Sequence, residues 1–152
     1  MAPLIVMLAA AVVGRLIAAT GLWLAGDSWS GALRVGLAAM FVFTAVSHFN
    51  PRTRPDLVRM VPVSLPAPAL LVSVTGVLEF VGAVGLMVPP TMTAAAYGLM
   101  ALLVAMLPAN IHAARERLII AGRRAMPLLW RLPLQLFWIA ALWSVRSPTP
   151  SL

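Results

Sequence analysis

Few side chains in this sequence could carry chemistry, and most of them lie inside or beside long apolar runs. Glu79 lies near the middle of one such run, LLVSVTGVLEFVGAVGLMV at residues 70–88, which is long enough to cross a bilayer. A carboxylate at that depth is costly unless it faces a partner or a polar cavity. Small residues lie three or four positions away on the same helical face, at Thr75, Gly76, Gly82 and Ala83. Such a face packs closely against neighbouring helices in lipid.

A partner for Glu79 is suggested by Arg15, which lies near the centre of the first apolar run, residues 3–25. Opposite charges at a similar depth in a low-dielectric bundle attract each other, and either one alone would be costly. We therefore expect an ion pair between Arg15 and Glu79. Three alternatives stay open: Arg15 reaches one membrane surface, Glu79 pairs with Arg131 or with an Asn or Gln side chain, or Glu79 is protonated and hydrogen-bonded.

A polar pocket is expected to gather residues from several apolar runs: His48, Glu79, Asn110, Arg131 and Gln135. Quinone binding would need only an apolar slot with a few donors such as His48, Asn110 or Arg131.

Other cofactors find less support in the sequence. His48 and His112 could ligate a haem from two helices, but both lie near helix ends, where an interfacial or capping histidine is far commoner. The sequence has no Rossmann glycine pattern, no phosphate-binding loop and no carboxylates at metal-ligand spacing. It also has no cysteine, which excludes disulfides, thiolate metal sites and cysteine nucleophiles. We expect no metal site and no enzyme that acts on its own.

The composition is that of an integral membrane protein. Of the 152 residues, 62% are hydrophobic and only 10% are charged, whereas a soluble domain carries about 25% charge. The mean hydropathy is +0.98. The net charge of +7 comes from arginine without any lysine, and it clusters between apolar runs. That distribution indicates a topology signal and not a nucleic-acid-binding face. We expect a single membrane domain over residues 1–152, in contact with lipid.

Five apolar segments predict five transmembrane helices, at about residues 3–25, 30–49, 69–88, 91–113 and 127–146. A turn at residues 26–31 connects the first two and offers three residues that can cap the second: Asp27, Ser28 and Ser30.

The connections carry their own signals. Pro55 should open a short amphipathic helix at residues 54–62 that lies in the headgroup region. Pro108 should kink the fourth span and free the carbonyl of Val104. Residues 114–126 predict an exposed polar loop or a short surface helix.

Arginine is unevenly shared between the two sides of a five-span bundle. The connections after the second and fourth spans hold Arg52, Arg54, Arg59, Arg115, Arg117, Arg123 and Arg124, whereas the opposite side has only Arg34 and Arg146. By the positive-inside rule, the basic connections and the N-terminus should be cytoplasmic in the plasma (inner) membrane of a bacterium.

Several ordered motifs resemble the DoxX-like family of small multi-pass membrane proteins: HFNP, VRMVPVSLPAP, LLVSVTGVLEFVGAVGLMVP, AAYGLMALLVAMLPANIHAA and RLPLQLFWIAALW. The resemblance covers roughly residues 39–145. It implies an all-α, four-helix transmembrane bundle, so the span at residues 3–25 would be an extra N-terminal helix. It also implies links to thiosulfate:quinone oxidoreductase subunits, to membrane oxidoreductase complexes and, in animal relatives, to receptor assembly. It marks His48, Glu79, Asn110, Arg131 and Gln135 as the polar positions without giving any of them a catalytic role.

Three functions are consistent with these features. The first is a small integral membrane subunit or assembly factor with a buried polar pocket around Glu79 and Asn110, whose small-residue faces hold partner helices in a homo-oligomer or a larger membrane complex. The second is a quinone- or lipid-binding subunit of an oxidoreductase complex. The third is a small-solute or proton-coupled transporter that uses Glu79 as its titratable group.

Overall fold

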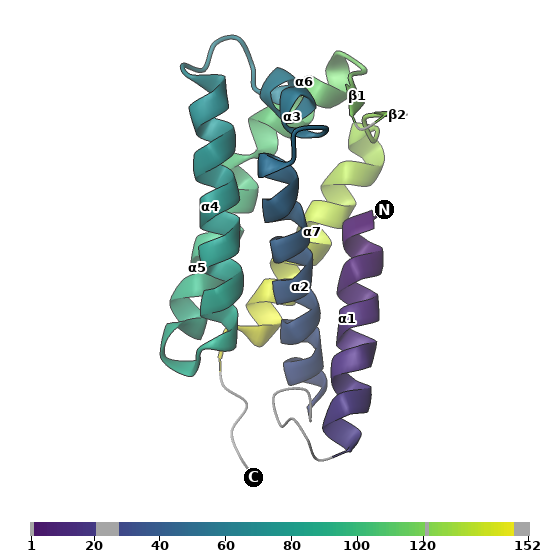
Figure 1. Ribbon diagram of the computed structural model, residues 1–152, viewed down its shortest axis with the longest axis vertical. Helices are drawn as coiled ribbons and strands as arrows, with labels where there is room; N and C mark the ends of the chain where they lie inside the picture. The colour runs from purple at the N-terminus through teal and green to yellow at the C-terminus, as the bar shows by residue number, and fades with distance from the viewer. Residues whose placement is uncertain (1, 21–27, 121, 148–152) are drawn as a thin grey trace.

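The computed structural model describes residues 2–20, 28–120 and 122–147, and this part of the chain is a helical bundle (Figure 1). Five helical stretches in it are long and apolar enough to cross a membrane. They are α1 (Ala2–Ala19), α2 (Trp29–Phe49), α4 (Pro68–Met87), the stretch Pro89–Arg115 and α7 (Leu128–Val145). The expectation of an all-α bundle with five apolar spans is therefore confirmed.

The helix boundaries follow from local sequence signals. Ser28 is the cap of α2, because its hydroxyl accepts a hydrogen bond from the backbone nitrogen of Gly31 at 2.9 Å. Gly26 and Asp27 of the predicted turn lie outside the described part of the chain. Pro68 lies in the first turn of α4, where its missing N–H costs nothing. At the other end of α4, two prolines form a short 3₁₀ turn, η2 (Pro89–Thr91).

The fourth span is interrupted next to Pro108, as predicted. It consists of α5 (Met92–Ala105) and α6 (Leu107–Arg115), with Pro108 in the first turn of α6. The prediction had named the carbonyl of Val104 as the one that Pro108 frees. At this break, the side-chain nitrogen of Gln135 donates a hydrogen bond to the carbonyl oxygen of Leu103 at 2.8 Å. The interruption thereby links α5 to α7.

The predicted interfacial segment forms the short helix α3 (Arg54–Met60), which begins with Pro55 in its first turn and contacts α2, α4 and α6. Residues 114–126, predicted as an exposed polar loop or a short surface helix, lie mostly outside helices, and a small hairpin that was not predicted forms among them. These residues contain two short strands, β1 (Ile119–Ile120) and β2 (Arg123–Arg124), which pair antiparallel. Gly122 has φ of +76°, a conformation that glycine adopts without strain, so the chain can reverse there.

Four helices form a closed ring, in which α2 contacts α4, α4 contacts α5, α5 contacts α7 and α7 contacts α2. Helix α1 packs against α2 alone among the described helices, on the outside of the ring (Figure 1). The architecture is thus a four-helix core with one peripheral N-terminal helix. Helices α3 and α6 and the β1–β2 pair lie together at one end of the bundle.

Glycines bring the helices of the ring close together. A Cβ atom at Gly76 would lie 2.6 Å from the Cβ of His48 in α2, and one at Gly82 would lie 2.5 Å from a methyl carbon of Leu99 in α5. The small-residue face around Glu79 therefore packs against neighbouring helices of the same chain. It is not an open surface for partner helices, contrary to the subunit hypothesis.

The predicted pair between Arg15 and Glu79 is not formed. Helix α1 ends at Ala19, so Arg15 lies one turn from its C-terminal end and not at mid-span. Its guanidinium carbon lies 5.8 Å from the centre of the Trp29 ring, at the first residue of α2. Glu79 lies deeper along α4 and faces His48 instead.

Candidate functional site

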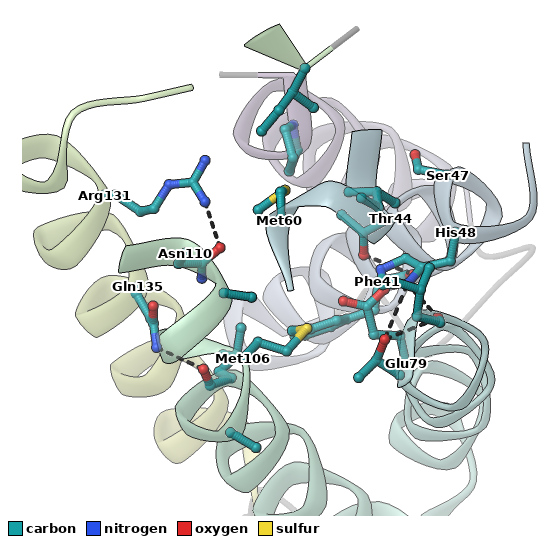
Figure 2. A pocket seen from close by; sticks show the side chains of 18 of the residues that line it. Phe41, Thr44, Ser47, His48, Met60, Glu79, Met106, Asn110, Arg131 and Gln135 are labelled. Atoms are coloured by element: carbon teal, nitrogen blue, oxygen red, sulfur yellow. Dashed lines mark hydrogen bonds and ion pairs between the residues drawn. The ribbon is translucent and has the colours of Figure 1, made fainter. Parts of the chain in front are cut away.

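A cavity of about 490 Å³ lies inside the ring, at the end that α3 covers. All five residues predicted for the polar pocket line it: His48, Glu79, Asn110, Arg131 and Gln135. They come from α2, α4, α6 and α7, so the ring brings together side chains that are far apart in sequence (Figure 2). The five side chains therefore share one cavity wall.

The rest of the wall is mainly apolar. Helix α3 contributes Leu57 and Met60, the break between α5 and α6 contributes Met106, and Ile120 of β1 also reaches the cavity. A cavity of a few hundred Å³ with apolar walls and a few convergent polar groups is typical of sites for small amphipathic molecules.

On one side of the cavity, Glu79 and His48 form a buried pair. Glu79 is only 4% exposed, and its Oε2 lies 3.5 Å from Nε2 of His48. The other ring nitrogen, Nδ1, lies 2.8 Å from the carbonyl oxygen of Val72. Because a carbonyl oxygen only accepts, Nδ1 must carry a hydrogen. Nε2 then faces the carboxyl either as a donor in a charged imidazole or as an acceptor in a neutral one.

Arg54 holds this pair in place, a role that the sequence did not reveal. Its guanidinium donates to the carbonyl of His48 at 2.9 Å, to the carbonyl of Ala69 at 3.1 Å and to the hydroxyl of Ser73 at 2.9 Å. The first residue of α3 thus ties the end of α2 to the start of α4. This tie fixes the position of the His48 backbone.

The opposite side of the cavity carries amide and guanidinium groups (Figure 2). Arg131 donates to the side-chain oxygen of Asn110 at 2.5 Å, and Gln135, which is 6% exposed, donates to the carbonyl of Leu103. Both contacts join α7 to the interrupted α5–α6 span. Glu79 and Gln135 face each other across the cavity, since α4 and α7 are separated by α2 and α5 in the ring.

Three buried side-chain atoms in the described part of the chain have no hydrogen-bond partner: Glu79 Oε2, Gln135 Oε1 and Trp138 Nε1. All three residues line this one cavity. Leaving a buried polar atom unpaired costs roughly 1–3 kcal/mol. Residues around this cavity therefore carry polar atoms that no described protein group satisfies.

Trp138 was missed at the level of sequence, although a signal was present. Arg131, Gln135 and Trp138 follow each other at the spacing i, i+4 and i+7, which places them on one face of α7. Reading the indole as a third polar group on the Arg131–Gln135 face would have identified it.

His112 lies apart from the cavity that contains His48. Its Nδ1 is 3.1 Å from the carbonyl oxygen of Met60, and it borders a separate shallow groove together with Arg59 and Val63. The two histidines are therefore not brought together across one site. Among the described residues, no group of three or more His, Asp or Glu side chains is placed to hold a metal ion.

Comparison with family models places this chain in one family. Residues 37–146 match the model described as a domain of unknown function (DUF8561), a stretch that begins inside α2 and ends just after α7. No curated protein and no solved structure matches the chain. Since the matched residues include the whole cavity-bearing end of the ring and well over half of the sequence, the chain belongs to the DUF8561 family.

Proposed function

We propose that this protein is a small membrane subunit that binds an amphipathic molecule, a quinone or a lipid, in the cavity of its four-helix ring. One observation carries the proposal: the three unpaired buried polar atoms all belong to residues around a single, mainly apolar cavity. A bound head group would pair with these atoms, and an apolar body would cover the walls. The head group and the apolar body would both contribute to the free energy of binding.

The accessory-subunit hypothesis is retained in a modified form. The glycine face of α4 is covered by α2 and α5, so partner helices would have to use the outer surface of the bundle. The ring plus one outer helix has the arrangement that the DoxX-like resemblance implies, and we propose that the ring corresponds to that core. Neither His48 nor Arg131 can carry electrons, so any redox role would require a partner that supplies the redox centre.

The arginine-rich end of the bundle supports one orientation in the membrane. The arginines at positions 52, 54, 59, 115, 117, 123 and 124 lie in the connections around α3, α6 and the β1–β2 pair. We propose that this end faces the cytoplasm, which would place the cavity in the cytoplasmic half of the inner membrane.

Ligand retention tests the proposed function. The protein would be extracted into lipid nanodiscs, and bound molecules would be identified by native mass spectrometry and by solvent extraction. Ala109→Phe adds a ring at the cavity wall and should abolish retention, whereas Ala101→Phe, at an exposed position on α5, should preserve it. Both variants must keep the wild-type melting temperature within a few degrees. Retention of no amphipathic molecule by the wild type, or equal retention by both variants, would contradict the proposal.

A further inference from the structure

The unpaired atoms also restrict the head group of the ligand, an inference that rests on the proposed function. The amide of Gln135 has a fixed orientation, because its nitrogen must face the carbonyl oxygen of Leu103 at 2.8 Å. Its oxygen Oε1 is therefore the unpaired atom, and an amide oxygen only accepts hydrogen bonds. This atom needs a donor.

Trp138 presents the opposite requirement one helical turn away. An indole Nε1 only donates, so this unpaired atom needs an acceptor. Gln135 and Trp138 are three residues apart on α7, where side chains at this spacing are neighbours on one face. One face of α7 therefore presents an unpaired acceptor beside an unpaired donor.

We propose that the cavity binds an apolar molecule whose head group carries a hydroxyl, held between Gln135 Oε1 and Trp138 Nε1. A hydroxyl donates one hydrogen bond and accepts others, so a single group satisfies both atoms. A ketone, an ether or an ester oxygen only accepts, so it pairs with Trp138 and leaves Gln135 Oε1 unpaired. A carboxylate or a phosphate oxygen leaves it unpaired in the same way.

Glu79 gives the same preference from the other side of the cavity. Its Oε2 lies 3.5 Å from His48 Nε2 but has no hydrogen bond, and it can accept one in either protonation state of the pair. A hydroxyl can donate to it, whereas an oxygen that only accepts cannot. A molecule with hydroxyls at two ends of a small head group would serve both sides.

Matched probes test this inference in phosphatidylcholine nanodiscs. The probes are 1-dodecanol, its methyl ether 1-methoxydodecane, and laurate, which differ only at the head group. The wild type should bind the alcohol at least about fivefold more tightly than the ether, the effect of one net hydrogen bond of about 1 kcal/mol. Displacement of the ligand that co-purifies with the protein, measured by native mass spectrometry, gives the three relative affinities.

Variants assign the preference to the two atoms. Gln135→Leu should bring the alcohol-to-ether ratio to about one, because the acceptor is gone. Trp138→Phe should weaken both probes and leave the ratio unchanged, because either probe oxygen can accept from the indole. Trp130→Phe, at an exposed tryptophan of the same helix, is the control and should change neither value. If Gln135→Leu does not fold, the alcohol-to-ether affinity ratio of the wild type still tests the hydroxyl preference.

Each contrary outcome has a distinct meaning. Equal binding of alcohol and ether by the wild type would overturn the hydroxyl preference and leave the proposed function standing. Tightest binding of laurate, lost in Arg131→Gln, would replace the hydroxyl by an anionic head group. Binding of none of the three, together with no co-purifying ligand to displace, would overturn this inference and the proposed function together and indicate a cavity filled by water.

Discussion

The His48 imidazole lies between a backbone carbonyl and a carboxyl group, and this position limits where its protons can be. Nδ1 donates to Val72, so one further proton is needed for any favourable contact between Nε2 and Glu79. It belongs either to a charged imidazole facing a carboxylate or to a carboxylic acid facing a neutral imidazole. In both forms the two residues hold one shared proton in the wall of the cavity.

This sharing predicts energetic coupling between the two side chains. In a double-mutant cycle of His48→Ala and Glu79→Ala, we expect a coupling free energy of about 1–3 kcal/mol, because each residue alone would leave the other buried without its partner. Unfolding in SDS, followed by tryptophan fluorescence, would give the four free energies. The control cycle pairs Glu79→Ala with His112→Ala, which lies outside the cavity and should be additive. Additive effects in the first cycle would show that the 3.5 Å contact carries no interaction energy.

At the level of elements, close contacts between helices set the depth of each polar residue in the bundle and the rotation of the helix that carries it. Gly76 allows α2 to approach α4 at His48, and Gly82 allows α5 to approach on the other side. Arg54 then ties α2 to α4 at the end that α3 covers. The position of the His48–Glu79 pair is therefore set by helix packing as much as by the two residues themselves.

Substitution of Gly76 tests this packing. Gly76→Ala would place a Cβ 2.6 Å from that of His48, so α2 and α4 must separate, and we expect a loss of about 1–3 kcal/mol in the free energy of unfolding. Gly98→Ala is the matched control, because Gly98 lies in α5 and nothing would lie within 4 Å of its Cβ. There, alanine should stabilise the helix by about 0.5–1 kcal/mol. Opposite shifts in SDS unfolding are expected, and stabilisation by both substitutions would contradict the close approach at His48.

At the scale of the whole molecule, the bundle has one arginine-rich end and an apolar outer surface. Exposed side chains such as Ile5, Val12, Leu70 and Val81 project from the outside of α1 and α4. In water such a surface would drive aggregation, whereas in a bilayer it contacts lipid. By the positive-inside rule, the arginines at one end predict which way the bundle is inserted.

Reporter fusions test this orientation. Green fluorescent protein exported through the general secretion route does not fluoresce in the periplasm, so a fusion after residue 147 should be dark and one after residue 117 should be bright. Alkaline phosphatase at the same two sites should give the reverse pattern, which controls for expression. A bright C-terminal fusion would place the arginine-rich end outside the cell. It would also contradict the assignment of the cavity to the cytoplasmic half of the membrane.

The sequence alone determined the five apolar helices and the polar residues that they bring together. The free energy of placing a segment in a bilayer is close to a sum over its own residues, so spans can be read locally. Proline and capping signals are equally local, which is why the start of α2 and the interruption at Pro108 were predicted correctly. The five pocket residues converged because polar groups in a membrane bundle avoid lipid.

Only the tertiary structure decided which of these groups touch. Glu79 faces His48 and not Arg15, because depth and rotation depend on where α1 ends and on how closely Gly76 lets α2 approach. The rotation of α7 places Trp138 in the cavity wall. The break after α5 leaves the carbonyl of Leu103 in that helix to accept a hydrogen bond from Gln135. These relations depend on contacts between segments distant in sequence, and such contacts leave no local pattern in the residues of either segment.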